Sequence, residues 1–272
     1  MRWALAIAAA VLVPVGAHAQ DAAQAQDRGP RFCPTRPSLG ESACVTEPGH
    51  VQVEVSAVDW TLAKDADARE DTVLAGDFLV RVGVSPTSEL QVGWTPYGHV
   101  RTRDRATGAI EGDERVGDVV IGYRQNLRSP DGSGLSFGIE PRVTLPVGRS
   151  PVGAGTWGAA LVVPVTYDLT DTLNIALTNE VDAAPDQDGR GRHFALNEVL
   201  GLGYDLTEKL TAVAELQVER ERDPADHQTR ALAAGSLAWQ PRHGLQLDVL
   251  VGAGLNRDAD DVRMLAGGAV GF

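Results

Sequence analysis

A two-residue alternation of apolar and polar side chains runs through most of the chain, from His50 to Phe272. It occurs in segments of roughly ten to fourteen residues, each followed by a turn or a polar loop. In segment 244–256, for example, one face carries only apolar side chains: Leu245, Leu247, Val249, Val251, Ala253 and Leu255. Successive side chains of a β-strand point to opposite faces, so the pattern predicts a two-faced sheet, and no segment sustains the stripe of an amphipathic helix.

Twelve such segments follow one another, and single-chain bacterial barrels have an even number of strands. They lie near residues 50–62, 72–84, 90–103, 115–127, 134–147, 156–168, 172–183, 193–206, 209–220, 229–240, 244–256 and 261–272. Short turns such as LTDT alternate with longer, charged loops such as AKDADARED. We therefore predict an all-β fold, a closed antiparallel transmembrane β-barrel of about twelve strands, with short periplasmic turns and longer extracellular loops. A soluble β-sandwich alternates in the same way and is the third alternative, although its strands are usually shorter.

The N-terminal part of the chain has a different composition. Arg2, an apolar run from Ala4 to Val15 and the motif Ala17-His18-Ala19 predict a cleaved signal peptide over residues 1–19. Residues 20–48 show no periodicity and are expected to form a periplasmic segment, and residues 49–272 the outer-membrane barrel. Cys33 and Cys44 are the two cysteines; in an oxidising compartment they predict a disulfide, with a metal or redox role as the alternative.

Charged residues recur in mid-strand on the face opposite the apolar one. In a barrel this face lines the lumen, so we predict contact with water or solute for Glu54, Asp77, Arg81, Arg101, Arg103, Asp118, Arg124, Glu140, Arg142, Glu180, Glu215, Asp248 and Arg263. An eight-stranded barrel is filled by its side chains and a sixteen-stranded one leaves an open channel. Twelve strands therefore predict a narrow, partly occluded conduit, and the alternative is a salt-bridge mesh that fills the barrel.

Several classes of function are disfavoured. A net charge of −13 argues against a nucleic-acid partner, which would select a basic surface. No serine stands at a recognisable spacing from a histidine, so no enzyme is predicted, and no cofactor or metal site either. Asp186-Gln187-Asp188-Gly189 has two carboxylates spaced as in calcium loops but lacks the later bidentate glutamate, which favours a solvated loop.

Phe272 ends the last segment on its apolar face. A terminal aromatic residue of this kind is what the barrel-assembly machinery of Gram-negative bacteria reads, so that machinery, outer-membrane lipid and lipopolysaccharide are expected partners.

Two positions do not fit the alternation. Glu198 falls on the apolar face unless a bulge near Asn197 turns it inward, and Asp59-Trp60 breaks the register of the first segment.

Four stretches resemble one known family: GHVQVEVSAVDW at 49–60, GDVVIGYRQNL at 117–127, PRVTLPVG at 141–148 and LAGGAVGF at 265–272. They are similar to the meta-pathway phenol-degradation proteins, a family of outer-membrane transporters. The resemblance implies a barrel that takes up small solutes, including aromatic or hydrophobic compounds. We therefore expect a passive, porin-like transport barrel; the alternative is a non-conducting structural or adhesive barrel that binds a surface partner through its loops.

Overall fold

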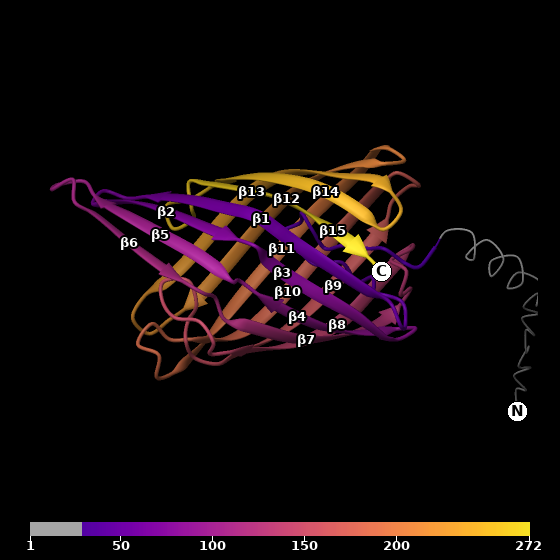
Figure 1. Cartoon of the computed structure of the whole chain (residues 1–272), viewed down its shortest axis with the longest axis horizontal. Coiled ribbons are helices and arrows are strands. Elements are labelled where there is room, and N and C mark those ends of the chain that lie inside the picture. Colours follow the sequence, from indigo (N-terminus) through magenta and orange to yellow (C-terminus); the bar gives the residue numbers. More distant parts are fainter. Residues whose placement is uncertain (1–28) are drawn as a thin grey trace, which may run out of the picture. The chain divides into compact units, whose positions relative to one another are not determined.

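The computed structural model describes residues 29–272, so the predicted signal peptide and residues 20–28 lie outside the described part of the chain. Residues 31–272 form one compact unit built on a single antiparallel sheet of fifteen strands (Figure 1). Within the described residues, no helix is long and apolar enough to cross a membrane.

The strands follow the chain in order. Their bounds are β1 Val51–Lys64, β2 Ala68–Ala75, β3 Asp77–Ser85, β4 Ser88–Trp94, β5 Tyr97–Asp104, β6 Ile110–Arg115, β7 Val119–Arg128, β8 Leu135–Leu145, β9 Gly158–Asp168, β10 Leu173–Pro185, β11 Arg192–Thr207, β12 Leu210–Arg222, β13 His227–Arg242, β14 Leu245–Gly254 and β15 Val262–Gly271.

The sheet closes on itself because β1 pairs with β15 as well as with β3. The closed belt contains twelve strands, namely β1, β3, β4 and β7 to β15, which confirms the predicted barrel. At the seam, Val51 and Phe272 exchange backbone hydrogen bonds of 3.1 and 2.8 Å. We call this end of the barrel, which also carries the short turns, the turn end, and the opposite end the loop end.

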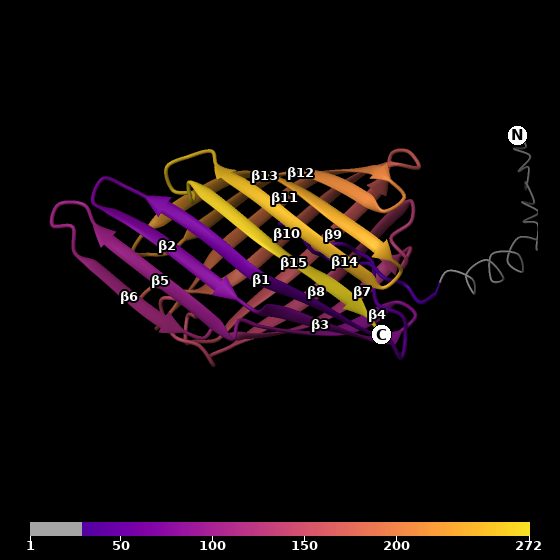
Figure 2. The same ribbon diagram turned by 45° about the horizontal axis from the view of Figure 1, so that its top comes forward.

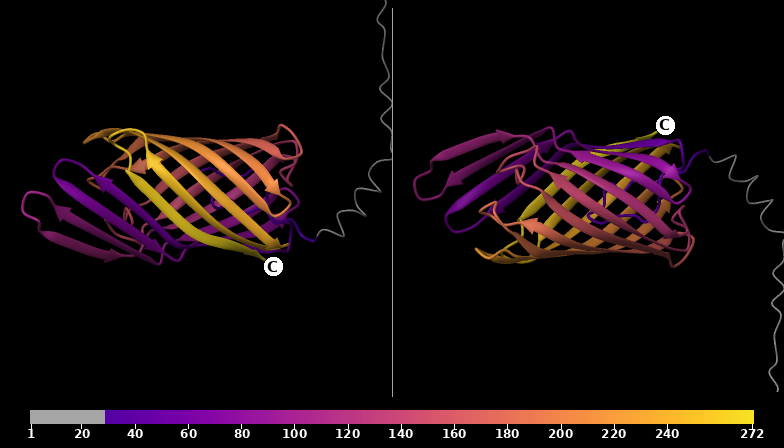
Figure 3. Two further views of the ribbon diagram at one scale, coloured as in Figure 1. Left: turned by 90° about the horizontal axis from the view of Figure 1, so that it is seen from above. Right: turned by 90° about the horizontal axis from the view of Figure 1, so that it is seen from below.

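Two of the twelve predicted segments, 72–84 and 90–103, are each divided into two strands. A further strand, β6, lies almost wholly in the loop predicted between segments 90–103 and 115–127, and a break separates it from β7. The breaks fall at Gly76, at Thr95–Pro96 and at Val116–Asp118. Gly76 has a φ of +70°, which favours glycine, and Pro96 has no N–H to donate to a neighbouring strand. The strands beyond the breaks, β2, β5 and β6, pair with one another and with the end of β1, and project beyond the loop end (Figures 2 and 3). Among the described strands, β6 pairs only with β5.

The two faces of the wall differ as the alternation predicts. Outward side chains such as Leu200, Leu202 and Val249 are apolar and remain exposed, whereas the buried interior is mostly polar. Tyr167, Tyr204 and Trp239 also lie on the outward face, toward the turn end of their strands. An apolar exterior around a polar interior is the reverse of a soluble domain and suits a hydrocarbon surrounding.

The two misfit positions have different explanations. The β1–β15 pairing shifts between Ser56 and Val58, so a bulge turns Asp59 inward. The pairings of β11 are regular around Glu198, which stands opposite Asn179 and Val218 and is exposed on the outward face. The pairing therefore has no bulge near Asn197, and the Glu198 carboxylate stays on the outward face.

Candidate functional site

Residues 31–48, which we call the plug, lie inside the barrel. The sequence predicts a periplasmic segment here, and for these residues the prediction is wrong. The reason is hydrogen bonding: the backbone of the plug is bound by inward-facing side chains of the wall, including those of Glu54, Glu215 and Thr178. An extended segment without periodicity gives no signal of such a position, since it has no hydrophobic face of its own.

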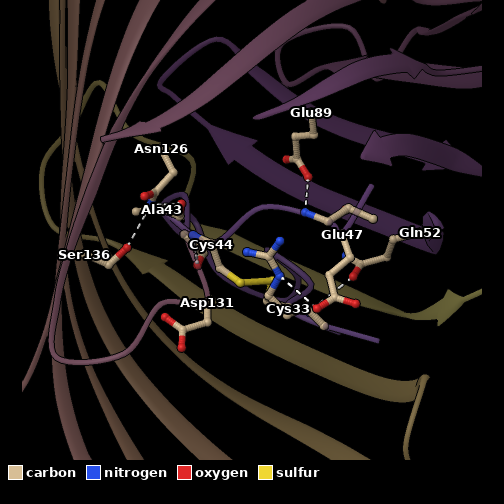
Figure 4. Close-up of a disulfide and its surroundings, with 12 residues drawn as sticks. Cys33, Ala43, Cys44, Glu47, Gln52, Glu89, Asn126, Asp131 and Ser136 are labelled. Atoms are coloured by element: carbon tan, nitrogen blue, oxygen red, sulfur yellow. Dashed lines mark hydrogen bonds and ion pairs between the residues drawn. A yellow bond between two sulfur atoms is a disulfide. The ribbon is translucent and has the colours of Figure 1, made fainter. Parts of the chain in front are cut away.

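A disulfide of 2.03 Å joins Cys33 and Cys44 and closes the plug into a loop (Figure 4). The guanidinium of Arg81 donates to the carbonyl oxygens of both cysteines, at 2.6 and 2.8 Å. On the other side of the loop, the Asn126 side chain donates to the Ala43 carbonyl at 2.8 Å. The disulfide and the wall therefore hold the same turn of the plug from two directions.

The wall beside the plug carries alternating charges across neighbouring strands, which we call the charge ladder. It consists of Glu54 on β1, Arg81 on β3, Glu89 on β4, Arg124 on β7, and Glu140 and Arg142 on β8. Its N···O distances are 3.1 Å from Arg81 to Glu54, 2.9 Å from Arg81 to Glu89 and 2.5 Å from Arg124 to Glu140. The Arg81 and Arg124 side chains are fully buried. Removing one partner of such a buried pair typically costs about 3–5 kcal/mol, because the other charge is left uncompensated.

Glu41 of the plug completes the ladder. Its carboxylate forms an ion pair with the Arg124 guanidinium, with an N···O distance of 2.5 Å, and also pairs with Arg142. Burial alone would raise the pKa of Glu41, but the Arg142 and Arg124 guanidiniums outweigh it and hold this pKa at about 2. Glu41 therefore stays ionised at neutral pH and binds the plug to the wall through charge.

Further polar contacts from β1, β12 and β14 also hold the plug. Glu54 accepts the backbone N–H groups of Thr35 and Arg36, at 3.1 and 3.0 Å. Asp248 on β14 pairs with the Arg36 guanidinium at 2.8 Å. Glu215 on β12 accepts the backbone N–H of Leu39 at 3.1 Å. These lumen carboxylates are thus engaged by cationic or N–H donors.

The remaining predicted residues are placed differently. Glu180 lies 3.9 Å from Arg142, at the end of the ladder. Asp77 and Asp118 both line a cavity at the loop side of the plug, and Asp118 accepts the N–H groups of the β8–β9 loop at Gly148 and Gly155. Arg263 pairs with Asp59 at 2.7 Å.

A lumen position is wrong for Arg101 and Arg103. They lie on β5 in the projecting extension, where both are exposed. The break at Thr95–Pro96 takes them out of the closed belt, so they follow β2 rather than the lumen wall.

The sequence-based list also missed residues that hold the plug. They are Arg36 and Glu41 on the plug itself and Glu89, Asn126, Thr178 and Gln246 on the wall. Glu89 belongs to the same alternation as Gln91, and a strand predicted to start two residues earlier would have included it.

Space remains on both sides of the plug. A cavity of about 220 Å³ lies among Glu41, Trp94 and Asp118. Another of about 300 Å³ lies among Phe32, Asp168 and Gln240, toward the turn end. A third, of about 190 Å³, lies between the plug and Glu54, Asp77 and Leu265. The lumen is therefore interrupted by the plug rather than filled along its length.

A family described as “Putative MetA-pathway of phenol degradation” matches residues 35–272, which include most of the plug and the whole barrel. The chain belongs to this family. The family match therefore confirms the resemblance seen in the four sequence stretches. No curated protein matches the sequence significantly.

Solved structures similar to this chain are outer-membrane barrels. The COG4313 outer membrane channel from Pseudomonas putida F1 has a TM-score of 0.68 at 12% identity, covering 84% of this chain and 97% of that one. The beta domain of the Bordetella autotransporter BrkA has a TM-score of 0.50 at 14% identity, covering 83% and 100%. The transport unit of the autotransporter AIDA-I from Escherichia coli also scores 0.50, at 8% identity and 88% and 91% coverage. Family and fold together identify this chain as an outer-membrane β-barrel.

Proposed function

We propose that the barrel is a passive channel for small solutes, with single-ring aromatic compounds as the solute class and the plug as its constriction. The observation that carries the proposal is the arrangement of the lumen. A charged, closed wall surrounds a bound segment, and cavities lie on both sides of that segment. The turn end then faces the periplasm and the loop end the cell exterior.

The sizes and linings of the cavities support this solute class. A cavity of about 150 Å³ is enough to hold benzene, and the two cavities beside the plug are about 220 and 300 Å³. The larger one combines apolar groups such as Phe32 and Val213 with polar groups such as Asn174 and Gln240. This lining suits a ring that carries a hydroxyl or carboxyl group, and the family's description refers to phenol degradation.

A non-conducting structural barrel is the second candidate. It is favoured by the density of ion pairs that fix the plug, since Arg81, Arg124 and Glu41 each bridge more than one partner. In this case the charge ladder and plug would serve to fill and stiffen the barrel.

Planar-bilayer conductance and liposome swelling separate the two candidates. The mature chain would be compared with a variant that lacks residues 31–48, using 4-hydroxybenzoate as the aromatic probe and gluconate as a non-aromatic control. We expect conductance in both proteins. In liposomes with the mature chain, we expect faster swelling with 4-hydroxybenzoate than with gluconate. Conductance that appears only when the plug is removed would favour the structural barrel, and silence of both proteins would reject the channel.

We also propose two partners of the assembled barrel. Phe272, whose side chain is exposed at the seam, would be the signal for the barrel-assembly machinery. The loop end would meet lipopolysaccharide through its charged loops. Neither partner requires catalysis, and the proposal assigns no enzymatic role to the chain.

A further inference from the structure

Three side chains, two from loops and one from the start of β11, converge at the loop end of the barrel, away from the plug. Asp186 directly follows β10, His193 is the second residue of β11, and Asp223 directly follows β12. The Nδ1 atom of His193 lies 3.0 Å from a carboxylate oxygen of Asp186 and 3.6 Å from one of Asp223. One nitrogen and two oxygens are thus gathered within 4.8 Å of one another.

The charge of this group is not balanced as it is in the lumen. Each buried carboxylate of the charge ladder pairs with a guanidinium. In contrast, among the residues that the structure describes, neither Asp186 nor Asp223 pairs with an arginine or lysine, and His193 is their common ion-pair partner. The side chains of His193 and Asp223 are 6% and 4% exposed. A single imidazole proton can be donated to one of the two carboxylates, so the other has no cationic partner among the described residues, and backbone N–H groups alone face its charge.

The surrounding backbone positions the two carboxylates. Asp223 accepts the N–H groups of Gln187 and Ala225, at 2.8 and 2.7 Å, which fixes its side chain across the two loops. A side chain at Gly191 would place its Cβ 1.9 Å from the Asp186 carboxylate, so the glycine leaves the space that this carboxylate occupies. The loops therefore fix the Asp223 carboxylate and leave room for that of Asp186, while His193 is carried by strand β11.

We propose that Asp186, His193 and Asp223 bind a zinc ion that ties the β10–β11 loop to the β12–β13 loop. Zinc forms tetrahedral sites with bonds of about 2.0–2.1 Å to histidine nitrogen and carboxylate oxygen, which sets ligand atoms about 3.3 Å apart. The two separations from His193 Nδ1, 3.0 and 3.6 Å, lie on either side of this spacing, and all three ligand atoms lie within 4.8 Å of one another. A water molecule would take the fourth position. Calcium suits the group less well, because it requires six to eight oxygen ligands.

The proposal is tested with the untagged mature barrel, refolded in detergent and titrated with Co²⁺ and then Zn²⁺. We expect one Co²⁺ per chain with the intense visible absorption of tetrahedral cobalt, which Zn²⁺ displaces. His193→Ala and Asp223→Asn should each weaken binding at least tenfold. His227→Ala, which removes an exposed histidine at the start of β13, is the matched control and should bind as the parent does.

Heat-modifiable gel migration checks that each variant is folded, and Asp186→Asn replaces His193→Ala if the latter does not refold. Absence of stoichiometric binding in the parent barrel would overturn the proposal. Unchanged binding in the folded ligand variants would overturn it too, because the metal would then sit elsewhere on the chain.

Discussion

Replacing Glu41 by Gln tests whether the plug is held by charge. This substitution keeps the size of the side chain and removes the charge that faces Arg124 and Arg142. The plug retains its other anchors, such as Arg36 with Asp248 and the Arg81 bonds to the cysteine carbonyls. We therefore expect a weakened plug in an intact barrel.

The size of the effect follows from the pKa of Glu41. The bound plug lowers this pKa from 4.5 to about 2. Each pKa unit corresponds to about 1.4 kcal/mol, so the ionised carboxylate stabilises the bound plug by about 3 kcal/mol relative to the released one. If opening requires release of the plug, loss of this charged carboxylate would raise the open fraction by up to about 300-fold.

Single-channel recording in planar bilayers measures this fraction. Glu47→Gln is the matched control, because Glu47 lies on the same segment but is more exposed and pairs with Arg31 at 3.5 Å. Exposed pairs contribute about 0–1 kcal/mol, so the control should resemble the parent. Equal open fractions for Glu41→Gln and Glu47→Gln would refute the reasoning.

The same pKa fixes the pH dependence. A carboxylate whose pKa is lowered by binding contributes fully above its unperturbed value of 4.5, and its contribution is lost as the pH falls toward about 2. The parent channel should therefore lose this stabilisation only below about pH 4.5, with an opening component that Glu41→Gln lacks. An equally steep acid response in both proteins would assign the titration to another group.

Three further predictions concern the wall and the seam. Glu198→Leu should raise the free energy of unfolding in lipid vesicles by about 1–2 kcal/mol, because a carboxylate facing hydrocarbon is costly; Glu208→Leu, in the turn after β11, should not, and equal urea midpoints would contradict this. Gly83→Ala would put a Cβ 1.9 Å from the Glu47 carbonyl oxygen, so we expect higher conductance with unchanged heat-modifiable migration, whereas Gly235→Ala, with open space around it, should have no effect. Deleting Phe272 should lower the outer-membrane yield several-fold but leave refolding in detergent intact; a normal yield in cells would refute its role as an assembly signal.

The strand faces could be predicted from the sequence because a closed wall between lipid and a polar lumen imposes the alternation residue by residue. Arg81, Arg124 and Glu140 are on the inward face for this reason, and the structure buries all three in ion pairs. Glu198 is an exception to the apolar outward face. The alternation places it on this face and it lies there, although a carboxylate facing hydrocarbon is unfavourable.

The plug could not be predicted in the same way. Its position depends on hydrogen bonds from its backbone to distant side chains, and no periodicity records such contacts. The division of the strands did have a local sequence signal, although the alternation continues across it. Pro96 and Gly76 both weaken a continuous strand, and they stand where the wall divides. Arg101 and Arg103 were assigned to the lumen because the alternation of apolar and polar residues continues past Pro96.

One edge of β6 has no partner strand among residues 29–272, and this limits which medium can surround it. Backbone N–H and C=O groups along an unpaired edge need water, and hydrocarbon offers no partner for them. Every residue of β6 is exposed, and Glu111, Asp113, Glu114 and Arg115 make it a poor template for another chain's strand. The membrane surface must therefore lie between this strand and the turn end, near the level at which the wall divides. The unpaired backbone of β6 therefore limits how deeply the protein can insert into the bilayer.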